Sequence, residues 1–392
     1  MLLVRQQGFR SATSEDFSEI KGLAVAAGSQ VVSHISAVRK IPHPATFLGS
    51  GKVLEIPDLV NKLAVDVVIL DHNATPVQER NLEQAFHCQV IDRTRLILDI
   101  FAQRARTSEG KLQVELAQLN HLATRLVRGW THLERQRGGL GLRGPGETQL
   151  ETDRRLIGRR IKTLRRKLEK VRSQRALRRN QRDRVPIPTI AIVGYTNTGK
   201  TTLFNALSGA TGLAVDQLFA TLDPMMRRLD ISGYGPVIVS DTVGFISQLP
   251  HELVSAFQAT LEEVVKADVI VHVRDAANED TENQKADVLA VLRDLGLGEA
   301  VGDMLIEVLN KANLLASADV AAVQNRTSRT NQRMVLISAR DGSGIDTLLG
   351  AVDHIFAAGR VELALRIPWA DGAELTWLYD HGEVLARQDR DE

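Results

Sequence analysis

The chain has 392 residues, of which 43% are hydrophobic and 25% are charged, a composition typical of a globular protein with two or three domains. It contains no apolar run long enough to span a bilayer, and its first 28 residues carry acids and lack the apolar core of a secretion signal. One cysteine, Cys88, rules out an internal disulfide, and the ten histidines show no metal-ligand spacing, so we expect a protein of the reducing cytoplasm.

Residues 1–105 are predicted to form a small α/β domain, because strand and helix patterns alternate along them. Apolar β-type runs cover residues 30–35, 65–70 and 89–92, and residues 78–86 have a helical pattern. The sequence Gly-Ser-Gly-Lys at residues 49–52 precedes another predicted helix. It lacks the first glycine of a phosphate loop, so we interpret it as a helix start, with a contact to phosphate or RNA as the alternative.

Residues 106–185 are predicted to form a helical arm, because apolar side chains recur there at spacings of four and three. The first series is Leu112, Leu116, Leu119, Ala123, Leu126, Trp130 and Leu133, and the second is Ile157, Ile161, Leu164, Leu168 and Val171. A glycine-rich stretch between them, residues 138–146, is not expected to be helical. We therefore predict two long antiparallel helices joined by a tip loop, with two independent helices on a flexible linker as the alternative.

The second predicted helix is strongly basic. Residues 154–184 contain fifteen Lys or Arg and two acids, a local charge of +13 in a chain whose net charge is only +1. Such a block can be a solvated surface, but it is also the electrostatic footprint of a nucleic-acid-binding element. We favour the second interpretation and expect RNA as the ligand, since a long basic arm suits the phosphates of folded RNA.

A phosphate-binding loop follows at residues 194–201, which match G-x-x-x-x-G-K-[ST] at every fixed position. An apolar strand precedes it and a helical pattern follows it, so successive backbone N–H groups and a helix N-terminus would point at one anion. The predicted phosphate contacts are Gly194, Tyr195, Thr196, Asn197, Thr198, Gly199, Lys200, Thr201 and Thr202. Lys200 is expected to reach the β- and γ-phosphates, and the Thr201 hydroxyl to bind Mg²⁺.

Two further segments fit the same nucleotide. A strand at residues 236–241 ends in D-x-x-G, where Asp241 could support Mg²⁺ through water and the Gly244 N–H could meet the γ-phosphate. Thr221 could close over that phosphate and its metal. The predicted contacts are Phe219, Ala220, Thr221, Leu222, Asp223, Asp241, Thr242, Val243 and Gly244. Lys200, Thr221 and Gly244 are the predicted catalytic residues, and Thr201, Thr221 and Asp241 the predicted metal site.

The base is expected to bind between two more strand ends. One strand ends in N-K-x-N and the next in S-A-R, which gives Asn310, Lys311, Ala312, Asn313, Ser338, Ala339 and Arg340 as base contacts. The order and spacing of all these motifs resemble the G domain of the translation-factor class of GTPases. Residues 186–358 are therefore predicted to form a P-loop G domain, a mostly parallel sheet with helices on both faces. Residues 359–392 are predicted to form a short C-terminal α+β unit.

Three segments resemble the HflX family of GTPases, within the Obg–HflX-like superfamily: GPGETQLETDRR at residues 144–155, GYTNTGK at 194–200 and FATLDP at 219–224. The resemblance covers nearly the whole chain, including residues 49–53 and 111–116. It implies a GTPase with GTP or GDP and Mg²⁺ as ligands. It also implies a partner, the large (50S) ribosomal subunit with its RNA, and a role in splitting or rescuing stalled ribosomes by a protein that is monomeric off the ribosome.

Other functions fit the same residues. The G domain could serve ribosome assembly or ATP-dependent RNA remodelling, or the chain could be an RNA-binding scaffold with a weak or regulatory nucleotide site. Two residues also depart from expected motifs. Phe245 stands where many GTPases, though not this family, carry a water-orienting glutamine, so we expect slow hydrolysis without a partner. Asn313 stands where the family carries an aspartate, so we expect weakened guanine preference.

Overall fold

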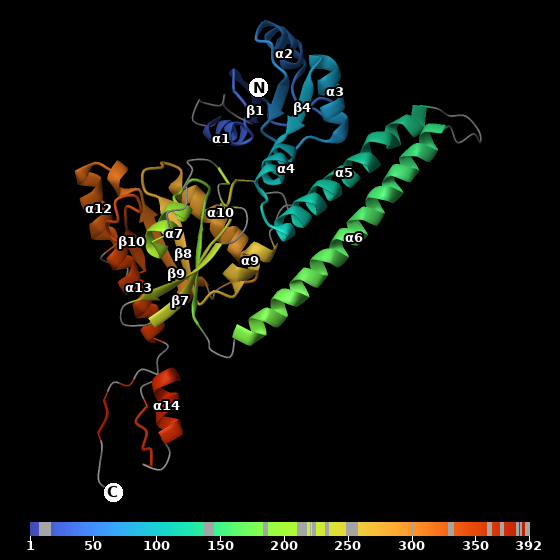
Figure 1. Cartoon of the computed structure of the whole chain (residues 1–392). Coiled ribbons are helices and arrows are strands. Elements are labelled where there is room, and N and C mark those ends of the chain that lie inside the picture. Colours follow the sequence, from blue (N-terminus) through green and yellow to red (C-terminus); the bar gives the residue numbers. More distant parts are fainter. Residues whose placement is uncertain are drawn as a thin grey trace.

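The computed structural model is an α/β structure with two sheets and a long helical hairpin (Figure 1). It describes residues 1–7, 17–136, 145–182, 187–209, 218–219, 221, 225–231, 235–247, 258–298, 301–327, 333–358, 363–368, 372–381, 384 and 386–388. In this part of the chain, no helix is both long enough and apolar enough to cross a membrane.

The N-terminal part is built on a four-stranded parallel sheet in the order β2-β1-β3-β4. Its strands are β1 (Leu2–Gln7), β2 (Ser33–Val38), β3 (Val67–Leu70) and β4 (Gln89–Asp92), and its helices are α1 (Ser18–Ala26), α2 (Ser50–Lys62), α3 (Pro76–Phe86) and α4 (Arg93–Arg104). The prediction of β4 is confirmed with its bounds, and α2 starts at the predicted Gly-Ser-Gly-Lys. Strand β2 begins three residues later than predicted, although the Val32 N–H already donates to the carbonyl oxygen of Met1, next to β1.

The helical pair consists of α5 (Ser108–Gln136) and α6 (Pro145–Arg182), which lie side by side in Figure 1. Leu164 and Leu168 of the predicted series are buried, while Ile157, Ile161 and Val171 are half-buried. The predicted loop at 138–146 needs one correction, since α6 already begins at Pro145; a proline suits the first helical turn, where no N–H is needed. Residues 138–144 lie outside the described part.

The C-terminal part contains a six-stranded sheet in the order β10-β9-β8-β5-β7-β6, with only the edge strand β6 antiparallel. The strands are β5 (Thr189–Gly194), β6 (Met225–Ile231), β7 (Gly235–Asp241), β8 (Val269–Asp275), β9 (Leu305–Asn310) and β10 (Met334–Leu336). The helices are α7 (Lys200–Ser208), α9 (Gln258–Val265), α10 (Thr281–Asp294), α11 (Val301–Met304), α12 (Ser317–Thr327), α13 (Ile345–Ala358) and α14 (Gly372–His381). The predicted mostly parallel sheet is confirmed. In the tail, residues 363–368 belong to neither helix nor strand.

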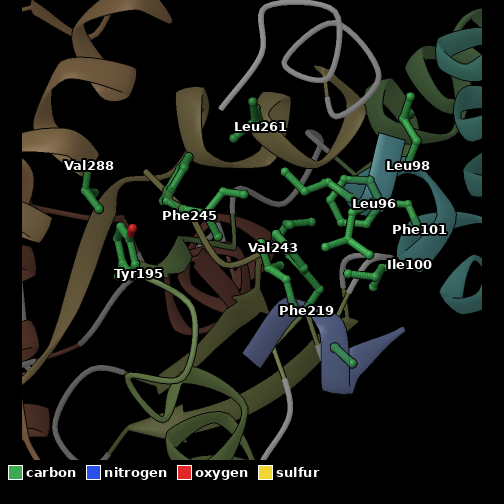
Figure 2. Packing of buried hydrophobic residues seen from close by; sticks show 14 of the residues in the cluster. Leu96, Leu98, Ile100, Phe101, Tyr195, Phe219, Val243, Phe245, Leu261 and Val288 are labelled. Atoms are coloured by element: carbon green, nitrogen blue, oxygen red, sulfur yellow. The ribbon is translucent and has the colours of Figure 1, made fainter. Parts of the chain in front are cut away.

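Alternate side chains of the central strand β5 point into different cores. Ile190 and Ile192 pack with α7 and α13 on one face of the sheet. Ala191 and Val193 belong to a second cluster with α9 and α10 on the other face. That second cluster continues into the N-terminal part through α1 and α4, as Figure 2 shows for Leu96 and Phe101 beside Phe219 and Val243. The two sheets are therefore joined by a shared apolar core.

Candidate active site

The loop after β5 has a backbone that only glycine can supply at two positions. Gly194 has φ 153°, and a Cβ there would lie 2.2 Å from the carbonyl oxygen of Val273. Gly199 has φ 90°, and its Cβ would lie 2.3 Å from Asn310 Nδ2. Helix α7 begins directly after Gly199, so its free N–H groups open onto the loop. This is the strand, turn and helix geometry that the motif predicts.

Lys200 is folded back into this loop. Its Nζ donates to the carbonyl oxygen of Tyr195 at 2.7 Å, and the Thr198 hydroxyl donates to the same oxygen at 3.0 Å. Burial lowers the pKa of Lys200 to about 8, although the nearby carboxylate of Asp241 acts in the opposite direction. A phosphate at the loop would supply the negative charge that the buried ammonium group lacks.

Three oxygen-bearing side chains meet beside the loop. The hydroxyls of Thr201 and Thr221 are 2.8 Å apart, and each lies 2.9 Å from Oδ2 of Asp241. Oδ1 of Asp241 is buried and has no partner among the described residues. Burial raises the pKa of Asp241, while Lys200 and the two hydroxyls oppose the rise. Hard oxygens around an unsatisfied buried carboxylate fit Mg²⁺, as the sequence predicts for these three residues.

The segment after β7 pairs with the phosphate loop. The Phe245 N–H donates to the carbonyl oxygen of Gly194 at 3.1 Å, and the Thr196 N–H to that of Phe245 at 2.7 Å. A Cβ on Gly244 would lie 3.0 Å from Lys200 Nζ, so the glycine backbone borders the lysine directly. Thr242 is buried and donates to Ile192 O at 2.7 Å. Its main chain is thereby held against β5.

Most of the predicted residues surround one cavity of about 320 Å³. Its lining is Thr196, Asn197, Gly199, Lys200, Thr201, Thr202, Phe219, Thr221, Thr242, Gly244, Asn310, Lys311, Asn313, Leu314, Ala339 and Arg340. Leu314 was not predicted, although it follows the N-K-x-N motif directly. Ala220, Leu222 and Asp223 lie outside the described residues.

Other predicted contacts lie behind the lining. Gly194, Thr198 and Ala312 shape the loops, and Asp241 lies behind the two threonines. Two of the predicted side chains face away: Val243 is buried in the apolar cluster, and the Tyr195 ring packs there with its hydroxyl bonded elsewhere. The spacing of the motifs could not indicate these directions.

Two residues of the N-K-x-N motif hold the loops together. Asn310 donates from Nδ2 to Thr198 O at 2.8 Å and accepts from the Ala339 N–H at 2.9 Å. The Lys311 ammonium pairs with Asp275 at 2.7 Å. Asp275 was not predicted, although it ends the apolar run that forms β8. Asn313 is thereby left as the polar side chain of the motif that is available to a base.

A polar network joins this site to the N-terminal part. The Tyr195 hydroxyl and the Ser247 hydroxyl each donate to Glu19 Oε2 at 2.9 Å. Arg93 pairs with Glu19, donates to the Ser247 hydroxyl at 3.0 Å and pairs with Asp71 at 2.6 Å. Burial and Glu19 raise the pKa of Tyr195, so the phenol stays protonated and can donate. Sequence reasoning missed this network because its members are far apart along the chain.

Comparison with known proteins gives consistent matches along the chain. Three family descriptions match: "GTP-binding GTPase N-terminal" over residues 14–102, "GTP-binding GTPase Middle Region" over 104–182, and "50S ribosome-binding GTPase" over 189–311. The GTPase HflX of Escherichia coli (strain K12) is 47% identical over 381 residues, which cover 94% of this chain and 88% of that protein. The GTPase HflX of Magnetococcus marinus is 44% identical over 378 residues, covering 96% and 86%.

Among solved structures, a GTP-binding protein from the archaeon Sulfolobus solfataricus in complex with GDP is 22% identical. The match covers 91% of this chain and 99% of that one, with a TM-score of 0.45.

Proposed function

Since this chain belongs to the HflX family of GTPases, we propose that its GTP hydrolysis serves an action on the large ribosomal subunit. The single observation that carries this proposal is the pairing of a GTPase site with a basic helix. Exposed cations run along α6: Arg154, Arg155, Arg159, Lys162, Arg165, Arg166, Lys167 and Lys170. Their charge suits RNA phosphates, and the family description matched by residues 189–311 names 50S ribosome binding.

The geometry supports a division of roles around the nucleotide. The backbone of residues 194–202 and the Lys200 ammonium would bind the phosphates, because both direct positive charge at one point. Thr201, Thr221 and Asp241 would hold Mg²⁺. When bound, this ion would neutralise the negative charge that develops on the phosphate oxygens during hydrolysis. The Gly244 N–H would meet the γ-phosphate, and Asn313 with Arg340 would contact the base.

The chain itself offers no water-orienting side chain at the position after Gly244. Phe245 is only 4% exposed and packs in the apolar cluster that Figure 2 shows. Its phenyl ring can neither accept nor donate a proton. Hydrolysis would therefore depend on the ribosome to order the segments around Thr221 and around residues 241–245.

This dependence suits an action on stalled ribosomes that are to be split or rescued in the cytoplasm. The protein would act as a monomer that meets the 50S subunit through its arm. A ribosome-assembly GTPase would hydrolyse GTP with similar dependence but act on immature particles. An RNA-binding scaffold would bind the subunit without accelerated hydrolysis.

The test is GTP hydrolysis by the full chain with and without 50S subunits, with 30S subunits as the matched addition. We expect slow hydrolysis alone, acceleration by 50S and none by 30S. Lys200→Ala should lower the accelerated rate by roughly tenfold or more, because it removes a charged contact to two phosphates. Fast hydrolysis that subunits leave unchanged would overturn the proposal. Splitting of 70S particles, followed by sedimentation, then separates rescue from assembly.

A further inference from the structure

The side chain placed to contact the base is the amide of Asn313, which lines the cavity. Guanine has two neighbouring hydrogen-bond donors on its edge and therefore needs two acceptors there. Asn310 bonds both Thr198 and Ala339, and Lys311 pairs with Asp275, so both side chains have structural partners. Asn313 lines the cavity from the short helix Ala312–Leu314. Of the motif's polar side chains, it is therefore the one placed to read the edge of a base.

The orientation of this amide depends on Ser338. The Ser338 hydroxyl lies 3.1 Å from Oδ1 of Asn313 and 3.0 Å from Oδ2 of Asp341. A hydroxyl has one proton, and a carboxylate is the stronger acceptor. When the proton goes to Asp341, a half-turn of the amide lets Asn313 Nδ2 donate to Ser338 instead. In either orientation, Asn313 offers one acceptor and one donor.

Guanine fits such an edge poorly. Its N1–H and its exocyclic amine are adjacent donors, and a carboxylate would accept from both. With Asn313, one donor meets the amide oxygen and the other faces the NH₂ group, so a charged hydrogen bond is lost and two donors oppose each other. Xanthine keeps the N1–H but has an acceptor oxygen in place of the amine. Its edge is complementary to an amide.

We infer that Asn313 determines base preference at this site and favours xanthine nucleotides over guanine nucleotides. The inference rests on the proposed nucleotide site and deepens it by specifying the base. It implies that this chain binds GTP with lower affinity than a protein with an aspartate at position 313 would, and hydrolyses it from that weaker complex.

The backbone amides beside the base position bear on adenine. If the Ser338 and Ala339 N–H groups were free, they would favour an acceptor at the position where adenine has a donor. In the structure, the Ser338 N–H donates to Ser343 O at 2.9 Å and the Ala339 N–H to Asn310 at 2.9 Å. Both amides are bonded within the protein, so they discriminate less strongly against adenine than free N–H groups would. ADP is therefore a necessary arm of the test.

The experiment measures equilibrium binding of GDP, XDP, IDP and ADP, each with Mg²⁺, to the wild-type chain and to Asn313→Asp. The wild type should bind XDP most tightly, and IDP at least as well as GDP, because hypoxanthine lacks the opposing amine. In Asn313→Asp the affinity ratio of GDP to XDP should rise by roughly 30- to 150-fold, which corresponds to a gained charged bond and a removed clash. Asn61→Asp adds the same charge at an exposed position of α2 and should leave the ratio unchanged.

Two results would overturn the inference. Tight, selective GDP binding by the wild type, with no gain in Asn313→Asp, would mean that another group reads the base. Loss of that selectivity in Asp341→Asn would identify Asp341 as this group. If none of the four nucleotides bound to the wild type, to Asn313→Asp or to Asp341→Asn, the proposed nucleotide site would be overturned as well.

Discussion

Among single residues, burial is the main cause of the shifted pKa values of Lys200 and Asp241. Lys200 is 6% exposed and Asp241 is fully buried, and they are the charged groups proposed to bind phosphate and metal. Neither group can be fully stable in its charged form without a partner of opposite charge. Phosphate and Mg²⁺ together would bring the opposite charges that these two buried groups need.

A second buried group, His272, makes stability depend on pH. It lies on β8, and burial lowers its pKa from 6.5 to about 3; Glu307 opposes the shift, while Arg274 and Lys285 add to it. The unfolded chain gains a proton below pH 6.5, whereas the folded chain does not until near pH 3. The stabilisation by neutral His272 is thus complete above pH 6.5 and lost as the pH falls. We expect this residue to lower the unfolding free energy by about 2 kcal/mol from pH 7 to pH 5.

Denaturant unfolding of the wild type, His272→Gln and His354→Gln at both pH values measures this effect. The His272 variant should lose that part of the pH dependence, because glutamine does not titrate. His354 is exposed on α13, so its variant should keep the wild-type difference. An equal pH dependence in all three proteins would show that His272 does not stay neutral in the folded chain.

Among the elements, helix α5 of the arm packs against the rest of the protein near its start, and helix α6 exposes many of its cations. Val114 and Ala117 of α5 are buried in the cluster shared by both sheets. On the other side of α5, Glu115 pairs with Arg160 of α6 at 2.6 Å. Helix α5 is therefore held on two sides, and α6 extends along it with Arg159, Lys162, Arg165, Arg166, Lys167 and Lys170 exposed. An α6 of 38 residues spans about 57 Å at 1.5 Å per residue.

Charge reversal on the arm should weaken ribosome association. Arg159→Glu, Arg165→Glu and Arg166→Glu change exposed cations of α6, whereas Arg160 is kept for its pair with Glu115. Each lost phosphate contact should lower the salt slope of binding by roughly 1, as counterion release requires. Co-sedimentation with 50S subunits at several salt concentrations measures the slope.

The matched control carries Lys62→Glu, Arg80→Glu and Arg293→Glu, three exposed cations that do not belong to the arm helices. It makes the same change of net charge and should bind subunits with the wild-type slope. Equal weakening by both triple variants would mean that total charge, and not the arm, governs association.

At the scale of the whole molecule, the N-terminal part and the GTPase part share one core. Phe101 of α4 and Phe219 contact each other edge to face, with ring centroids 4.7 Å apart. Phe219 has a strained backbone, with φ 56°, and lies two residues before Thr221. Both segments around the γ-phosphate position, near Phe219 and Phe245, are therefore packed in the same cluster as the N-terminal helices.

Removal of one ring should reveal this connection. Phe101→Ala should lower the unfolding free energy by about 3–5 kcal/mol. It should also lower hydrogen-exchange protection in residues 243–247, although these lie far from residue 101 in the sequence. Phe86→Ala removes an equally buried ring from the core confined to the N-terminal sheet, so residues 243–247 should keep their protection. Unchanged protection there in Phe101→Ala would mean that the two parts are energetically independent.

The elements that depend on local interactions could be predicted from the amino-acid sequence. The phosphate loop is recognisable because Gly194 and Gly199 occupy backbone conformations that other residues cannot adopt, and its neighbours follow at fixed spacing. Periodicity likewise indicated the two arm helices, whereas the predominantly parallel sheet was predicted from the resemblance of the motifs to GTPase G domains. It failed for β1, α1 and α4, which are short or lack clear alternation and are stabilised by their neighbours in the sheet and core.

The directions and contacts of the motif side chains, in contrast, depend on how distant parts of the chain pack together. Tyr195 and Val243 face the shared core instead of the nucleotide, and Asn310 bonds protein loops. The Glu19, Arg93 and Ser247 network joins residues separated by up to 228 positions. No local pattern records such contacts, because they arise when two separately patterned parts bury apolar surface against each other and their buried polar groups must find partners.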